Sequence, residues 1–249
     1  MFCLTATIKY VSNLLESTGL YEPELTADQA REQLGAEKTL LDAFPKNEWV
    51  LANFQATNEV QDKLSSIVEK AIRLLPNPNF PGMVAVDLGC GISPTPVHLL
   101  NQGFKVYAID SSMEVLEILK SKVNEINRNW IEEGKLVLVH QTIENFEYPE
   151  NVHLIHASES LPYCDPEKIS SIFLKAKAAL VKDGILACNF FPYMNSLTDG
   201  LTRRLFGGWL TTKNVVSAII LSVDFSRCIV KDGRSSTGIA PRIHVFAQG

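Results

Sequence analysis

Cysteine pairs, zinc-ligand clusters and long apolar runs are all missing from this sequence. Its five cysteines are an odd number, no two of them form a CxxC motif, and no His/Cys cluster has zinc-site spacing. The longest apolar run, Val215–Val223, is far shorter than the roughly 20 residues of a membrane span. The first residues, MFCLTATIKY, lack the basic and apolar segments of a signal peptide. We therefore expect a cytoplasmic protein with reduced thiols, without a metal site and without a membrane contact.

Positive charge is also sparse. Lysine and arginine number 23 against 28 acidic residues, giving a net charge of −5, and the basic residues are scattered. This distribution does not favour binding to nucleic acid or to anionic lipid. A length of 249 residues suits one α/β domain with an appendage, or two small domains. Nothing in the sequence indicates an oligomeric state.

From Met83 onward, short apolar runs alternate with helix-like stretches, which is typical of βαβ units and a parallel sheet. We expect parallel strands at 84–88, 105–109, 136–140, 153–157 and 185–191. A helix over 211–223 and two strands at 224–230 and 242–247 should follow, with these strands forming an antiparallel edge hairpin. The earlier residues show helical patterns, including a helix ending near Leu75. We predict a helical N-terminal extension or lid at 1–55 and a main domain at 56–249.

Helix starts are marked twice between the predicted strands. Ser111 and Glu114 have the spacing of a capping box, which predicts a helix running to about Asn129. Asp165 followed by Pro166 has the order of an N-cap and a first-turn proline, and predicts a helix that ends near the KDG segment at 182–184.

Two glycines follow the first predicted strand, and an aspartate ends the second. Gly89 and Gly91 lack a Cβ, so the backbone between them can turn sharply and approach a ligand. Ligands of open α/β sheets bind at the carboxyl ends of the strands, where Asp110 could accept hydrogen bonds from both hydroxyls of a ribose. This pattern predicts a cofactor that contains adenosine.

The residues around this turn distinguish two such cofactors. A nicotinamide dinucleotide needs a third glycine beside its pyrophosphate, but Pro94 stands at that position. Asp87 would repel a pyrophosphate and would favour a sulfonium or an α-amino group. The turn therefore predicts S-adenosylmethionine.

The segments VDLGCGIS and VYAIDSS resemble the class I S-adenosylmethionine-dependent methyltransferases. The similarity continues through HQTIENF, IHASESLPYCDP and LVKDGILACNFF. SESLPYCDPE is loosely similar to a turn in small-molecule methyltransferases of the bacterial tellurite-resistance type. The resemblance implies an α/β, Rossmann-like fold: a seven-stranded, mostly parallel sheet of order 3-2-1-4-5-7-6, with helices on both faces and an antiparallel strand seven.

The resemblance also implies a set of cofactor-binding residues. Asp87 and the Ala157 carbonyl would lie near the methionine amino group, Gly89 and Gly91 would offer backbone contacts, and Asp110 would bind the ribose. The residues implied around the adenine are Ser112, Met113, Ile143 and Glu144. Each has a structural alternative as a turn, cap, core or surface residue.

Methyl transfer mainly requires alignment of the acceptor and exclusion of water. A general base is needed only for a protonated acceptor, and we take Glu159 and Tyr163 as the catalytic candidates. Most histidines are interpreted as core or rim residues, with His156 as an exception because it precedes a strand tip. The Asn/Asp-Pro-Pro-Tyr signature of base and amide methyltransferases is absent. We therefore expect a small-molecule acceptor. A protein or RNA methyltransferase and a non-catalytic binding module remain alternatives.

Overall fold

The computed structural model describes residues 66–76, 81–192, 210–234 and 241–249. The predicted extension at 1–55 lies outside these residues, so the domain boundary remains a prediction.

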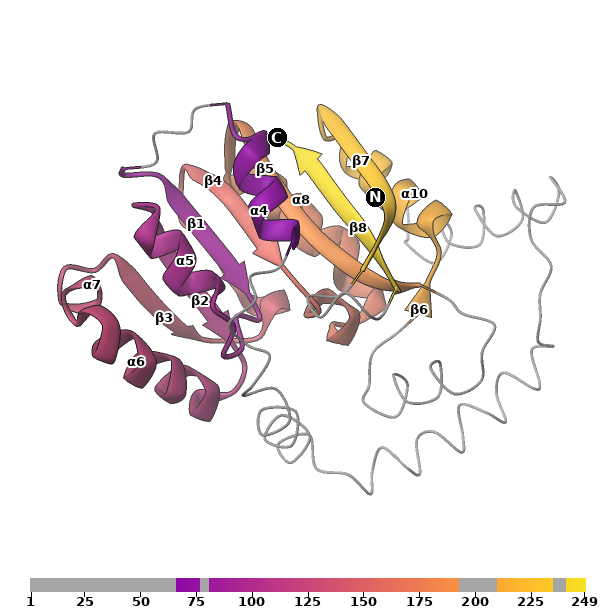
Figure 1. Ribbon diagram of the computed structural model, residues 1–249. Coiled ribbons are helices and arrows are strands. Elements are labelled where there is room, and N and C mark those ends of the chain that lie inside the picture. Colours follow the sequence, from indigo (N-terminus) through magenta and orange to yellow (C-terminus); the bar gives the residue numbers. More distant parts are fainter. Residues whose placement is uncertain (1–65, 77–80, 193–209, 235–240) are drawn as a thin grey trace, which may run out of the picture.

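One mixed sheet organises the described part of the chain (Figure 1). Its strand order is β3-β2-β1-β4-β5-β8-β7, and the short β6 pairs with β5 outside this path. Strands β1 to β5 are parallel to one another, whereas β8 is antiparallel to β5 and β7. The predicted order and the antiparallel edge hairpin are thus confirmed. The strands are β1 Val84–Leu88, β2 Lys105–Asp110, β3 Leu136–His140, β4 Val152–Ala157, β5 Leu180–Pro192, β6 Leu210–Thr211, β7 Arg227–Arg234 and β8 Pro241–Gln248.

Helices cover both faces of this sheet. Figure 1 shows α4 and α5 on the near side and α8 on the far side. The α-helices are α4 Ser66–Leu74, α5 Thr95–Asn101, α6 Met113–Asn127, α7 Asn129–Glu132, α8 Ile169–Ala179 and α10 Lys213–Val223. Three short 3₁₀ helices, η1 Ile143–Asn145, η2 Leu161–Tyr163 and η3 Pro166–Lys168, follow β3 and β4.

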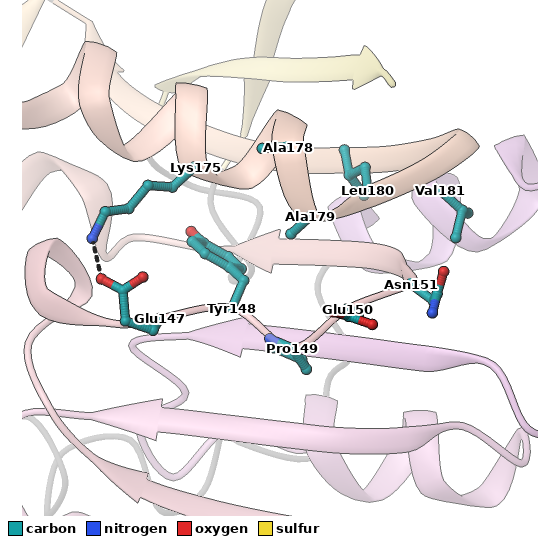
Figure 2. Close-up of a pocket in the computed structure, with 10 residues that line it drawn as sticks. All are labelled: Glu147, Tyr148, Pro149, Glu150, Asn151, Lys175, Ala178, Ala179, Leu180 and Val181. Carbon is teal, nitrogen blue, oxygen red and sulfur yellow. Dashed lines mark hydrogen bonds and ion pairs between the residues drawn. The ribbon is translucent and has the colours of Figure 1, made fainter.

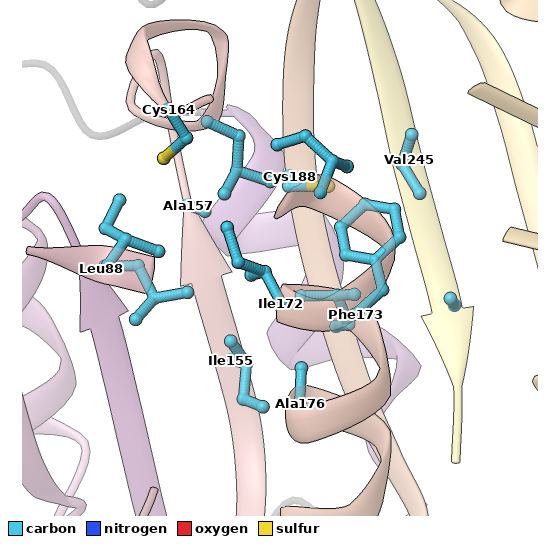
Figure 3. Close-up of a cluster of buried hydrophobic side chains, with 14 of the residues drawn as sticks. Leu88, Ile155, Ala157, Cys164, Ile172, Phe173, Ala176, Cys188 and Val245 are labelled. Atoms are coloured by element: carbon cyan, nitrogen blue, oxygen red, sulfur yellow. The ribbon is translucent and has the colours of Figure 1, made fainter. Parts of the chain in front are cut away.

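Each face of the sheet has its own hydrophobic core because successive side chains of a strand point to opposite sides. On one face, α8 packs over β4, with Ile172 and Phe173 close to Ile155 (Figure 3). On the other face, the core contains Val68 of α4 together with Leu154 of β4. Burial on both sides explains why the central strands are continuous apolar runs.

Several predicted boundaries differ from the structure. Strand β7 spans Arg227–Arg234 rather than 224–230, because Asp224 still caps the end of α10. Helix α10 begins at Lys213 rather than 211, because Thr211 belongs to β6. The N-cap of α6 is Ser112, not Ser111, and the Ser112 hydroxyl accepts a hydrogen bond from the Val115 amide. Helix α8 ends at Ala179, and the KDG segment is a bulge inside β5. There Leu180 pairs with Val152 and Ile185 pairs with Leu154. Pairing with β4 thus keeps these residues in the sheet despite their turn-forming composition.

Candidate functional site

The carboxyl ends of β1, β2, β4 and β5 meet at one edge of the sheet because these strands are parallel. The first residues of β8 lie at the same edge, since β8 runs in the opposite direction and Ile243 pairs with Phe190. Asp87, Asp110 and Ala157 lie within the last two residues of their strands, and the other predicted cofactor residues follow β1, β2 or the parallel strand β3 at this edge.

The two glycines of the loop after β1 differ in how much space surrounds them. Gly89 and Gly91 have φ angles of 65° and 54°, in the left-handed region that favours glycine. No described atom lies within 4 Å of the place where a Gly91 Cβ would be. At Gly89 that place is 2.5 Å from the Ser160 Cβ, so the loops after β1 and β4 touch there. A ligand can therefore approach the backbone at Gly91.

Asp110 connects this loop with the helix that follows β2. Its Oδ2 accepts a hydrogen bond from the Gly91 amide at 3.0 Å, and its Oδ1 accepts one from the Ser112 amide at 3.0 Å. Because a carboxylate has about four lone-pair sites, both oxygens keep capacity for another donor. The Asp110 carboxylate is thus fixed in place and can still bind two hydroxyls.

Asp87 forms a buried pair with His156. The two side chains are each 2% exposed, and His156 Nδ1 lies 2.7 Å from Asp87 Oδ1. Asp87 Oδ2 and His156 Nε2 are also buried and have no hydrogen-bond partner among the described residues. Unpaired buried polar atoms are uncommon in a folded protein, so these two atoms are candidates to bind a ligand or a water molecule.

The residues predicted around the adenine lie on two sides of this loop. Ser112 caps α6, and Met113 begins it with a side chain that is 46% exposed. After β3, Ile143 is buried, and its Cδ1 lies 3.6 Å from the place of a Gly89 Cβ. Glu144 Oε1 accepts a hydrogen bond from the Asp165 amide at 3.2 Å, so Glu144 also supports the loop after β4.

The turn after β4 holds Glu159 in a left-handed conformation, with a φ angle of 59°. The Glu159 amide donates to Asn189 Oδ1 at 2.6 Å, and its carboxylate forms a two-point ion pair with Arg242. The ion-pair distances are 3.1 Å from Nε to Oε1 and 2.8 Å from Nη2 to Oε2. Arg242 is 5% exposed. Glu159 is therefore held from β5 and from β8, just beyond the buried Ala157 at the end of β4.

An aromatic contact places Tyr163 near the same cluster. Its ring packs edge-on against Phe191 at 5.6 Å, and the Arg242 guanidinium lies 4.8 Å from the centre of the Phe191 ring. The two predicted catalytic candidates, Glu159 and Tyr163, thus lie close to one Phe191–Arg242 pair.

Sequence reasoning did not identify the Asn189 and Arg242 contacts. Both residues are polar and buried near the ends of otherwise apolar strands. A polar residue at such a position in the sequence could have indicated a functional or supporting role for Asn189 and Arg242.

Cys90 lies between the two glycines but is not a suitable nucleophile. Burial raises the pKa of its thiol well above the ordinary value, and the nearby Asp87 and Asp110 raise it further. The thiol therefore stays protonated and unreactive at neutral pH.

A separate pocket of about 460 Å³ lies at the opposite edge of the sheet (Figure 2). It is bounded by the segment before β4, the end of α8 and the start of β5, and contains no predicted site residue. A Lys175–Glu147 ion pair of 2.7 Å lies at its side. Because ligands of parallel sheets bind at the carboxyl edge, we do not assign the cofactor to this pocket.

Neither a metal cluster nor a membrane span is found in the described ranges. They contain no group of three or more His, Cys, Asp or Glu side chains arranged to hold a metal ion. None of their helices combines the length and apolar character needed to cross a bilayer.

Residues 85–184 match the family model described as a methyltransferase domain. No curated protein sequence matches the chain. Solved structures with a similar fold include phosphoethanolamine N-methyltransferase 2 of Haemonchus contortus in complex with S-adenosyl-L-methionine. It has a TM-score of 0.56 and 15% identity, over 66% of this chain and 37% of that one.

Two further structures share the fold. The cyclopropane synthase MmaA2 of Mycobacterium tuberculosis has a TM-score of 0.53 and 17% identity, over 66% of this chain and 61% of that one. A protein of Bordetella parapertussis described as a possible exported protein has a TM-score of 0.58 and 15% identity. That match covers 100% of this chain and 97% of the other. This chain matches less than two thirds of the length of the H. contortus enzyme and of MmaA2.

Proposed function

We propose that this chain is a class I S-adenosylmethionine-dependent methyltransferase that transfers a methyl group to a small-molecule acceptor, since residues 85–184 match the family model of a methyltransferase domain. The observation that carries the proposal is the carboxyl edge itself. There Asp110 is fixed with free acceptor capacity, the backbone at Gly91 is open, and the buried Asp87 has an orphaned oxygen. These three features suit the ribose, the backbone approach and the cationic end of S-adenosylmethionine.

Each predicted cofactor residue has a proposed task. Asp110 accepts hydrogen bonds from the ribose hydroxyls, and the backbone of Gly89 and Gly91 lies along the ligand. Asp87 and the Ala157 carbonyl accept from the amino group. Around the adenine we propose Ser112, Met113, Ile143 and Glu144.

S-adenosylmethionine supplies a methyl group already activated by a positively charged sulfur. The chain then needs to align the acceptor for in-line displacement and to exclude water. We propose that Glu159 and Tyr163 orient the acceptor beyond β4. The two-point contact with Arg242 holds the Glu159 carboxylate in one position, which suits orientation of a cationic or hydroxyl-bearing acceptor.

The choice of a small acceptor is supported by charge and by related structures. The net charge of −5 opposes the binding of a polyanion such as RNA. The H. contortus enzyme carries phosphoethanolamine in its name, and MmaA2 is named a cyclopropane synthase. The tellurite-resistance-like subtype remains a prediction.

Methyl transfer can be tested with S-adenosylmethionine carrying a tritiated methyl group. The purified chain is incubated separately with a metabolite extract, cellular RNA and cellular protein. We expect label in the low-molecular-weight fraction. Label only in RNA or in protein would instead support the second function, and binding of the cofactor without any transfer would support a non-catalytic binding module.

A further inference from the structure

The Asp87–His156 pair is a buried polar feature that no element of the fold requires. The two residues are register partners on the adjacent strands β1 and β4, and their side chains point to the face that α4 packs against. Neighbouring positions on that face, such as Ala85 and Leu154, are apolar core residues. Two polar side chains at the carboxyl end of this face therefore need a separate explanation.

The hydrogen bond of the pair determines which atoms remain available. A carboxylate has no hydrogen to donate, so the 2.7 Å contact requires the hydrogen on His156 Nδ1. His156 Nε2 is then an acceptor in the neutral imidazole. Asp87 Oδ2 is also an acceptor, and neither atom has a described partner. With the imidazole neutral, the pair thus offers two buried acceptors and no donor.

Charge specifies the ligand further. Among the ion pairs of the described residues, Asp87 is paired only with His156, and with a neutral imidazole the pair carries one buried negative charge. A buried charge without a counter-ion is costly, and a cation with several N–H donors would compensate it. A primary ammonium group has three donors and no acceptor, which matches the two free acceptors.

We propose that His156 is a cofactor-binding residue whose Nε2 accepts a hydrogen bond from the α-ammonium group of S-adenosylmethionine, next to Asp87 Oδ2. This inference rests on the proposed function. It is consistent with the position of the pair, because Asp87 lies two residues before Gly89 and His156 directly precedes Ala157. His156 takes no part in methyl transfer and fixes only the amino-acid end of the donor.

The decisive variant is His156→Asn. The Asn side-chain amide occupies the place of Nδ1 and still donates to Asp87, but no atom replaces Nε2. The matched control is His153→Asn on the same strand. His153 Nδ1 accepts from the Val84 amide at 3.3 Å, and the Asn oxygen can accept in its place.

Binding is measured calorimetrically with three probes: S-adenosylhomocysteine, its analogue without the amino group, and methylthioadenosine, which lacks the whole amino-acid part. We expect His156→Asn to weaken the binding of S-adenosylhomocysteine about 10- to 100-fold, the range of a hydrogen bond to a charged group. The other two probes should keep their affinities within about twofold. His153→Asn should change none of the three.

Other outcomes separate the two proposals. If His156→Asn weakens the binding of all three probes equally, or of none of them, His156 has only a structural role and the inference is wrong. If the wild-type chain binds none of the probes, the proposed function itself fails.

A measurement on the wild-type chain covers the case of a variant that does not fold. In a chain with ¹⁵N-labelled histidine, S-adenosylhomocysteine should shift the Nε2 resonance of His156, whereas methylthioadenosine should not. Equal shifts with both ligands would overturn the proposal.

Discussion

The two glycines of the loop after β1 differ in what surrounds them, and substitution should reveal this. Alanine at Gly91 meets no described atom, so its cost is the left-handed strain of about 1–2 kcal/mol. Alanine at Gly89 has the same strain and also collides with the Ser160 Cβ. We expect Gly89→Ala to lower the free energy of unfolding by about 1–3 kcal/mol more than Gly91→Ala, measured in urea.

A control and a rescue accompany this comparison. Gly82→Ala, at a φ angle of 87° and without a described atom within 4 Å, should behave like Gly91→Ala. Adding Ser160→Gly to Gly89→Ala removes the colliding atom and should recover the extra loss. Equal losses for the three alanine variants would contradict the packing described between the loops after β1 and β4.

Single residues could be predicted only where their role follows from local chemistry. Gly89, Gly91 and Asp110 could be proposed as site residues because backbone freedom and a carboxylate at a strand end have few other uses. The contact between Asp87 and His156 depends on the register of β1 against β4, which includes an irregularity between Val84 and Ala85. No local pattern encodes that register, so the pair emerged only from the structure.

At the scale of the elements, the ion pair between Glu159 and Arg242 connects the turn after β4 with β8 across the intervening β5. We expect a double-mutant cycle of Glu159→Gln and Arg242→Gln to give a coupling energy of about 0.5–3 kcal/mol. The lower part of this range is favoured because the Glu159 side chain is 34% exposed. Chemical denaturation of the four proteins provides the measurement, and additive effects would show that the contact does not stabilise the turn.

Most strands were predicted within one or two residues because parallel strands buried on both faces are distinct apolar runs. The start of β5 was missed. The segment Val181–Gly184 has turn-forming residues, with Asp183 at a φ angle of 66°, yet it is a bulge whose flanking residues pair with β4. Pairing with β4, which lies earlier in the sequence, outweighs the local turn propensity of this segment. Local sequence patterns do not reveal that pairing.

At the scale of the whole molecule, buried titratable groups should limit stability on both sides of neutral pH. Burial raises the pKa of Cys90, Cys164 and Cys188, so the folded chain keeps protons that an unfolded chain loses above about pH 8.5. Burial lowers the pKa of His98 and His244, so the unfolded chain takes up protons first below about pH 6.5. The free energy of unfolding should therefore be highest between these values and fall on either side.

Urea unfolding at pH 5.5, 7.5 and 9.5 tests this profile. Cys188→Ala should reduce the alkaline slope by about 1.4 kcal/mol per pH unit, because one thiol no longer titrates in the unfolded chain. A slope that is unchanged in Cys188→Ala, or stability that rises above pH 8.5, would contradict the assigned burial of the thiols.

The central claim is that the carboxyl edge of this sheet binds S-adenosylmethionine, and calorimetric titration of the chain with that cofactor tests it most directly. We expect saturable binding of one molecule per chain. Asp110→Asn loses the charge and one acceptor, and should weaken binding about 10- to 100-fold. The absence of binding at millimolar cofactor, or equal affinity of the wild-type chain and Asp110→Asn, would contradict the account.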